Sequence, residues 1–317
     1  MSDNSNNRGR AYEFVWAHTL LDALSKERKV VIVDNSSYQA NKKAWKAIDA
    51  NLQDVFKTSA KAAVKTLLEL EPRMAEPDKQ DLILEFQTDE AGVQGDVRDL
   101  VVKRDNIRWE IGLSIKHNHD AAKHSRLSHV LDFGKEWFNI PCSDKYWKKI
   151  KPVFDDLKIK KSKGVLWRDV PNKTANVYAP ILEAFVEEVQ RAYKKDKSMP
   201  KKMLEYIIGI HDYHKIVSYD KKKITTIETF NVHGTLNKPS KIRTSTIVVP
   251  SVKLPTELIA IRLKERSNTT VEMYLNNGWQ LSLRIHSAKT KVEPSLKFDI
   301  KFVGMPPTVL TFECKWN

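Results

Sequence analysis

The sequence is poor in cysteine and has no long run of apolar residues. Two cysteines among 317 residues, Cys142 and Cys314, are too few for a disulfide framework. No stretch approaches the roughly 18 uncharged apolar residues that a membrane span requires, and the start MSDNSNNRGR has no apolar signal core. We therefore expect a folded protein without a membrane partner, in a reducing cytoplasm.

Motifs for two classes of nucleotide-using enzymes are also missing. There is no G-x4-G-K-[ST] loop, so we do not expect ATP-driven movement along DNA or any use of ATP. The ten glycines form no dinucleotide fingerprint, and no F-x-G-x-G loop accompanies the pair Pro141-Cys142. That Pro-Cys pair therefore does not indicate a cytosine-5 DNA methyltransferase.

Positive charge is what the sequence has in excess. Lys and Arg number 54 against 40 Asp and Glu, which gives a net charge of +14 and a pI near 9.5. A composition of 41% hydrophobic and 30% charged residues is sufficient to bury a core. The excess favours a polyanionic partner such as nucleic acid, although a basic surface can also serve only solubility.

Apolar spacing predicts helices in the first part of the chain and strands in the last. Helical periodicity covers 8–27, 45–68, 144–164 and 176–197, with a strand from Lys29 and an interruption at Pro152. From 206 onward, short apolar runs such as 243–254 and 269–288 are separated by Asn, Gly and Pro. We expect an α+β fold of the broad α/β class, with domains 1–205 and 206–317.

A hairpin is expected between residues 82 and 116, with its turn at Asp105-Asn106. Side chains alternate along a strand, so Glu110, Ser114 and Lys116 point together, away from the apolar side. An antiparallel turn brings Asp96 and Asp99 back towards the same end of the sheet. The expectation is a cluster of carboxylates beside one lysine.

Such a cluster suits metal-dependent cleavage of a phosphodiester. Mg²⁺ takes carboxylate oxygens as ligands and stabilises charge on a phosphate under attack by water, and a lysine can hold or activate that water. A structural interpretation stands beside this one. Glu110 can pair with Arg98 or Arg108, and charged residues at strand ends are often only solvated.

The residues 95–138, GDVRDLVVKRDNIRWEIGLSIKHNHDAAKHSRLSHVLDFGKEWF, resemble the catalytic region of the HaeIII family of type II restriction endonucleases. The resemblance extends to GRAYE (9–13) and to 276–300. It implies a PD-(D/E)xK nuclease core, with a mixed sheet flanked by helices and a β-rich C-terminal region. It also implies Mg²⁺-dependent cleavage of double-stranded DNA at GGCC by a prokaryotic enzyme, paired with a cognate DNA methyltransferase. The two-fold symmetry of such a site favours a homodimer.

Under this resemblance, Asp99 matches the motif aspartate and Lys116 the motif lysine. The position two before the lysine is Ser114 where the motif has Asp or Glu, so another carboxylate must supply that charge. Glu110 is the first candidate and Asp96 the second, and Asp96 is also an alternative motif aspartate. Glu13 matches a helical glutamate that often assists in such folds, or it is an exposed first-turn acid favoured by the helix dipole.

Polar and basic residues after Lys116 are expected to start a helix that faces DNA, and the hairpin around Asn277-Gly278 presents a second polar face. The residues predicted to contact DNA are His117, Asn118, His119, Lys123, His124, Ser125, Arg126, Arg284, His286 and Lys289.

Two other functions remain open from the sequence. One is a repair or junction-resolving nuclease on the same fold. The other is a non-catalytic DNA-binding protein with a degenerate nuclease core, which Ser114 favours because a serine binds metal poorly.

Overall fold

A computed structural model describes residues 2–88 and 96–316; Gly95, where the longest resembling segment begins, lies outside them. The chain forms two compact units, each built from separate stretches of sequence. The first unit comprises 1–120, 210–253 and 307–317, and the second comprises 121–209 and 254–306. These bounds differ from the expected single division after residue 205. Among the described residues, no helix is long and apolar enough to cross a membrane.

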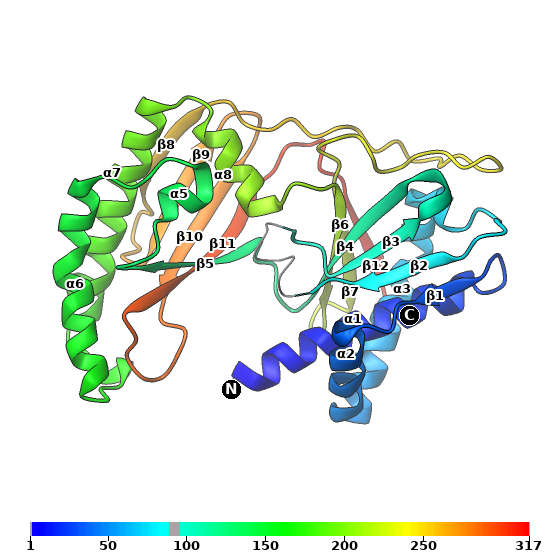
Figure 1. Cartoon of the computed structure of the whole chain (residues 1–317), viewed down its shortest axis with the longest axis horizontal. Helices are drawn as coiled ribbons and strands as arrows, with labels where there is room; N and C mark the ends of the chain where they lie inside the picture. Colours follow the sequence, from blue (N-terminus) through cyan, green and yellow to red (C-terminus); the bar gives the residue numbers. More distant parts are fainter. Residues whose placement is uncertain (1, 89–95, 317) are drawn as a thin grey trace. The chain divides into compact units, whose positions relative to one another are not determined.

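The first unit is a seven-stranded mixed sheet with helices packed against it (Figure 1). Its strand order is β1-β2-β3-β4-β6-β7-β12, with parallel pairs β1-β2 and β4-β6 and antiparallel pairs elsewhere. The helices and strands are α1 (Ser2–Leu24), β1 (Val30–Ile32), α2 (Ser36–Ala47), α3 (Ala50–Leu70), β2 (Leu82–Phe86), β3 (Leu100–Arg104), β4 (Trp109–His117), β6 (Tyr213–Tyr219), β7 (Ile224–Phe230) and β12 (Thr311–Lys315). This arrangement confirms the predicted mixed sheet flanked by helices.

The core of the first unit joins α1 and α3 to the sheet. Tyr12 and Trp16 of α1 are fully buried, as is Phe56 of α3, and they share one apolar cluster with Leu113 of β4. Burial of such side chains contributes about 1.5–3 kcal/mol each. Because α1 contacts β4, this packing holds the first helix beside the strand that carries Lys116.

The expected hairpin is β3-β4, and its turn is a short 3-10 helix, Asp105–Ile107. Val101 pairs with Gly112 and Lys103 with Glu110, so the register places Asp99 level with Ser114. The amide of Asp99 donates to the carbonyl oxygen of Leu113 at 2.8 Å, which continues the ladder beyond β3. The sequence pattern therefore predicted both the hairpin and its alternation.

The second unit is an antiparallel five-stranded sheet, in the order β5-β11-β10-β9-β8, with helices against one face (Figure 1). Phe185 of α7 and Trp137 of α5 contact Phe298 of β11, with ring centroids 4.9 and 6.1 Å apart. Its elements are β5 (Lys123–Ser128), α5 (Phe133–Phe138), α6 (Asp144–Ser162), α7 (Ala179–Lys195), α8 (Met199–Ile208), β8 (Leu258–Leu263), β9 (Thr270–Leu275), β10 (Gln280–His286) and β11 (Ser295–Gly304).

The expectation of a helix directly after Lys116 was wrong. Residues 123–128 form β5, and His124 to Leu127 alternate between exposed and buried as they pair with β11. A two-residue alternation over so short and charged a segment is weak, and only the pairing with a distant strand makes it decisive.

Other boundaries also differ from the sequence pattern. Pro152 does not interrupt α6, because Ile150, Phe154 and Leu157 bury a continuous apolar face while the proline is exposed. The long helix expected over 45–68 is divided, since Asp49 caps α3 by accepting from the Leu52 amide at 2.9 Å. Residues 243–254 form no strand.

Candidate active site

Asp99, directly before β3, and Lys116, near the end of β4, lie side by side at the open end of the hairpin. Lys116 Nζ lies 2.8 Å from Asp99 Oδ2, and the amide of Ile115 donates to the same oxygen at 2.6 Å. The two side chains are 33% and 21% exposed, so both are accessible from solvent while held in place. The structure therefore brings together the two residues that the motif comparison selected.

The Asp99 carboxylate controls the charge of the lysine. Burial alone lowers the pKa of Lys116, but the charge and hydrogen bond of Asp99, together with the charge of Glu13, outweigh it and raise that pKa. These two carboxylates therefore favour the cationic form of Lys116.

Glu13 of α1 interacts electrostatically with both Asp99 and Lys116. Burial raises the pKa of Glu13 to about 8, and the Asp99 carboxylate adds to the rise, while Lys116, Asn41 and Arg10 oppose it. Asn41 of α2, itself buried, donates from Nδ2 to Glu13 Oε2 at 2.9 Å. Mutual repulsion of two carboxylates beside each other is relieved by a cation between them, as in oxygen-ligated metal sites.

Two charged residues, Lys215 and Glu228, lie in the same row of the sheet as Ser114, and the sequence pattern did not predict them. Ser114 pairs with Lys215 of β6, which pairs with Glu228 of β7. Lys215 Nζ lies 3.2 Å from Glu228 Oε2 and donates to the Asp120 carbonyl at 3.1 Å. The available signal was a charged residue inside each of two otherwise β-forming runs, HKIVSY and ITTIETF.

Asp96 and Glu110 form ion pairs with Arg98 instead of joining the Asp99-Lys116 pair. Arg98 Nε and Nη2 donate to both oxygens of Asp96, at 2.8 to 3.0 Å, and Nη1 donates to Glu110 Oε1 at 2.7 Å. The stem of Arg98 crosses Gly112, where an added Cβ would come within 1.9 Å of Arg98 Cδ. The structural alternative that paired Glu110 with Arg98 therefore matches the geometry.

The first residues after Lys116 face the first unit's own groups. His117 Nε2 lies 2.9 Å from Asp220 Oδ2, and its ring packs against Phe56 at a centroid distance of 4.7 Å. Asn118 Nδ2 donates to the same Asp220 oxygen at 2.9 Å. His119 follows and is exposed.

In the second unit, the predicted DNA contacts on β5 occupy two different faces. Lys123 Nζ donates to the Tyr206 carbonyl at 2.8 Å and Ser125 bonds the Tyr206 hydroxyl at 3.1 Å, so both turn towards α8. Arg126 is exposed on the opposite side and donates to Ser295 Oγ at 3.0 Å. His124 is also exposed and lies 3.9 Å from Asp299.

The predicted residues near β10 also have partners inside the second unit. Arg284 lies 3.5 Å from Asp299, His286 Nδ1 lies 3.0 Å from the Ser287 carbonyl oxygen, and Lys289 pairs with Glu293 at 2.8 Å.

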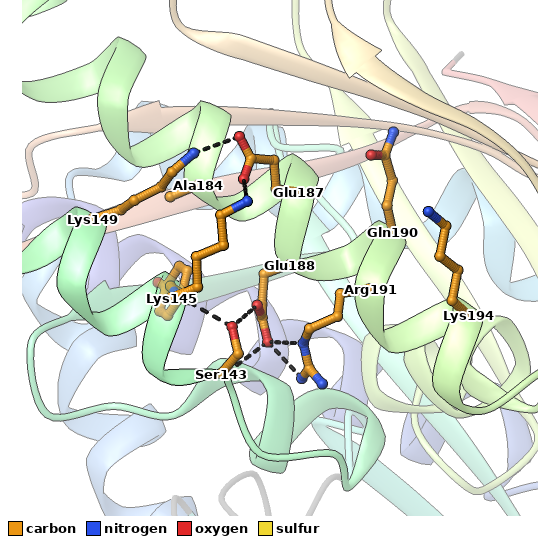
Figure 2. Close-up of a pocket in the computed structure, with 10 residues that line it drawn as sticks. Ser143, Lys145, Lys149, Ala184, Glu187, Glu188, Gln190, Arg191 and Lys194 are labelled. Carbon is orange, nitrogen blue, oxygen red and sulfur yellow. Dashed lines mark hydrogen bonds and ion pairs between the residues drawn. The ribbon is translucent and has the colours of Figure 1, made fainter.

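A cavity of about 300 Å³ lies between α6 and α7 of the second unit (Figure 2). Its acidic residues are already neutralised. Glu187 pairs with Lys145 and Lys149, whereas Glu188 accepts from Ser143 and lies 2.6 Å from Arg191 (Figure 2). The lining side chains therefore join α6 to α7 and leave a basic surface, and the cavity is not a second candidate metal site.

Comparison with known proteins gives one consistent result. A sequence model of the HaeIII restriction endonuclease family matches residues 9–306. The chain is 45% identical to "Type II restriction enzyme HaeIII" of Haemophilus aegyptius over 318 aligned positions, covering 100% of both chains. No solved structure matches at a significant level.

Proposed function

The chain belongs to the HaeIII restriction endonuclease family of type II enzymes, and on that premise we propose that it cuts both strands of duplex DNA at GGCC. Identity of 45% over the full length of a HaeIII enzyme carries this proposal. The Asp99-Lys116 pair on the β3-β4 hairpin supplies the matching chemistry. The repair-nuclease and non-catalytic alternatives have no observation in their favour that outweighs this match.

Divalent metal is a general requirement of type II restriction endonucleases, and we propose that Mg²⁺ is the ion here. The donor set fits such an ion, because Asp99 and Glu13 offer hard carboxylate oxygens whose mutual repulsion a cation relieves. Glu13 thus takes the part of the acid that Ser114 does not supply. Bound there, Mg²⁺ would stabilise negative charge on the attacked phosphate.

The residues of the chain then have distinct roles. Asp99 holds Lys116 by a 2.8 Å contact, and its own position is fixed by the Ile115 amide. Lys116 orients the attacking water and stabilises the negative charge that develops on the phosphate. Asn41 donates to Glu13 and keeps that carboxylate turned towards the site. Asp96 and Glu110 join the site only by leaving Arg98, so we propose that they maintain the hairpin.

Assembly and cellular role follow from the proposed site. GGCC is a palindrome, so a homodimer places one active site on each strand. Protection of the cell's own DNA requires a cognate methyltransferase that modifies the same sequence. Because such an enzyme has to reach DNA inside the cell, we propose the prokaryotic cytoplasm as its compartment. Residues 206–317 contribute strands to both units, and we propose DNA recognition for those in the second unit.

Digestion of a plasmid with known GGCC sites tests the proposal. We expect discrete fragments in Mg²⁺ and none in EDTA, with every end mapping to GGCC. Lys116→Ala and Asp99→Ala should lose cleavage by about 10²–10⁴-fold, the usual contribution of such groups, but should still bind a GGCC duplex. Cutting at unrelated sites, or full activity of Asp99→Ala, contradicts the proposal.

A further inference from the structure

Helices of the second unit pack on one face of its five-stranded sheet, whereas His124, Arg126 and Arg284 on the other face are exposed among the described residues. Leu281, Leu283 and Ile285 of β10 are buried on the side where α5 and α7 pack. The alternate residues point to the other side, where Gln280 and Arg284 are exposed and Ser282 and His286 are half-buried. The exposed side is a broad antiparallel surface, which we call the polar sheet face.

The pairing register places positive charge across this face. His286, Lys297 and Arg126 form one row across β10, β11 and β5. The next row holds Arg284, Asp299 and His124. A third row contains Arg262, Glu272, Ser282 and Lys301.

The two carboxylates do not cancel this charge. Glu272 is already bound by Lys264 at 3.2 Å and by the Tyr274 hydroxyl at 2.8 Å. Asp299 has a side chain only 9% exposed. Lysine and arginine therefore dominate the surface that a partner meets, and a polyanion is the complementary partner.

Asp299 lies in the middle row of the polar sheet face, next to Arg284 and His124. Its Oδ2 lies 3.5 Å from Arg284 Nη2, and its Oδ1 lies 3.9 Å from His124 Nδ1. Within the described part of the chain, Oδ1 is buried and accepts no hydrogen bond. A largely buried carboxylate is costly unless a cation lies beside it, so the Asp299 carboxylate favours the position of Arg284 next to Oδ2. Arg284 is thereby braced at its base while its side chain stays 58% exposed.

We propose that the polar sheet face is the surface that recognises duplex DNA, with Arg284 as a guanine-contacting residue, Asp299 as its positioning residue, and Lys297 and Lys301 as phosphate contacts. This inference rests on the proposed restriction activity. The planar guanidinium matches guanine O6 and N7, and half of the proposed GGCC site is guanine. Lysines flanking it at two-residue intervals on β11 are placed to meet the backbone.

Binding in EDTA separates recognition from cleavage. Full-length wild type and variants are titrated with a short GGCC duplex and with a scrambled duplex of equal composition. Arg284→Gln should lose about 5- to 150-fold for GGCC, since a bidentate arginine-guanine pair discriminates by about 1–3 kcal/mol. Its affinity for the scrambled duplex should change little.

The lysines have a different signature. Lys297→Gln/Lys301→Gln should weaken both duplexes alike and reduce the salt slope of log K by about two for each bound protomer. The matched control is Lys148→Gln/Lys161→Gln, which removes two exposed charges from α6, and its slope should stay that of wild type. Circular dichroism verifies folding of each variant.

Asp299→Ala tests the bracing. It should lower GGCC preference, and Arg284→Gln/Asp299→Ala should be no worse than Arg284→Gln alone. Additive losses contradict the positioning role.

The failures are distinguishable. If wild type cuts at GGCC and Arg284→Gln keeps the full preference, the guanine contact is overturned and the proposed function stands. If wild type shows no GGCC preference, the proposed specificity fails. The slopes of the lysine variants on either duplex then still decide the inference, because an unchanged slope overturns the face as a DNA surface.

Discussion

Gly112→Ala is expected to destabilise the protein through Arg98. A Cβ at residue 112 would lie 1.9 Å from Arg98 Cδ and 2.3 Å from Arg98 Cγ, so the arginine stem has to leave its place. Its guanidinium then loses Asp96 and Glu110. The Arg98 side chain is 7% exposed, so its charge is not rehydrated without further movement.

The magnitude follows from the exposure of each partner. Breaking a buried ion pair costs about 3–5 kcal/mol. The contact with Glu110 is discounted because that side chain is 44% exposed, and exposed pairs contribute about 0–1 kcal/mol. Replacing glycine also lowers the conformational entropy of the unfolded chain, which stabilises the folded state by about 0.4–1 kcal/mol. We expect a net loss of about 2–4 kcal/mol in the free energy of unfolding.

Urea unfolding followed by tryptophan fluorescence measures this loss. The matched control is Gly9→Ala in α1, where the added Cβ has no described atom within 4 Å apart from the neighbouring residues and the local helix backbone. Its expected change is a gain of about 0.5–1 kcal/mol, the ordinary preference for alanine in a helix. If the clash with Arg98 is the cause, Gly112→Ala adds little to Arg98→Ala. A fully additive double variant, or an unchanged midpoint for Gly112→Ala, refutes the reasoning.

Three further predictions concern the site and its supports. Glu13→Gln should lower the rate of plasmid cleavage by at least about 10²-fold, whereas Glu110→Gln should leave the rate per folded molecule close to wild type. If Glu110→Gln instead lowers the rate and Glu13→Gln does not, the missing carboxylate is Glu110. Lys215→Met should cost about 3 kcal/mol in urea unfolding, because it leaves Glu228 without its partner, and Lys215→Met/Glu228→Met should recover most of that loss; an additive loss contradicts the pairing. For Asp132, burial raises the carboxyl pKa, but donors including the Lys135 and Cys142 amides outweigh it and lower that pKa. Its contribution, about 1 kcal/mol for a helix cap, is therefore present above the unfolded value near pH 4 and is lost as pH falls through the lower folded value. Asp132→Asn should flatten thermal stability across that acid range, and an unchanged pH profile counts against the cap.

The hairpin was predictable because its information is local. Alternation along β4 and a polar turn determined which side chains share a face, and this placed Asp99 and Lys116 together. The choice among carboxylates was not local. Glu110 satisfied the alternation rule, but Arg98 reaches it only because Gly112 has no side chain. The position of Glu13 depends on packing of α1 against β4, which no short pattern encodes.

Dependence on distant parts of the chain also explains why the sequence pattern did not predict strand β5 or the Lys215-Glu228 pair. β5 is specified by its pairing with β11, far along the chain, and not by its own composition. Lys215 and Glu228 come together only because β6 pairs with β4 in parallel and with β7 in antiparallel. The division into 1–205 and 206–317 assumed that each domain is one contiguous stretch, whereas the first observed unit is built from three stretches of the chain and the second from two.

The discontinuity of the first unit affects when it can be completed during synthesis. β12 pairs with β7, and Cys314 lies in the same core as Tyr12 and Leu113. Residues 307–317 follow every residue of the second unit in the chain. A ribosome therefore makes the whole second unit before it makes the last strand of the sheet that holds Asp99 and Lys116. Translation order thus delays completion of the unit with the proposed active site until the surface proposed to select its target has been made.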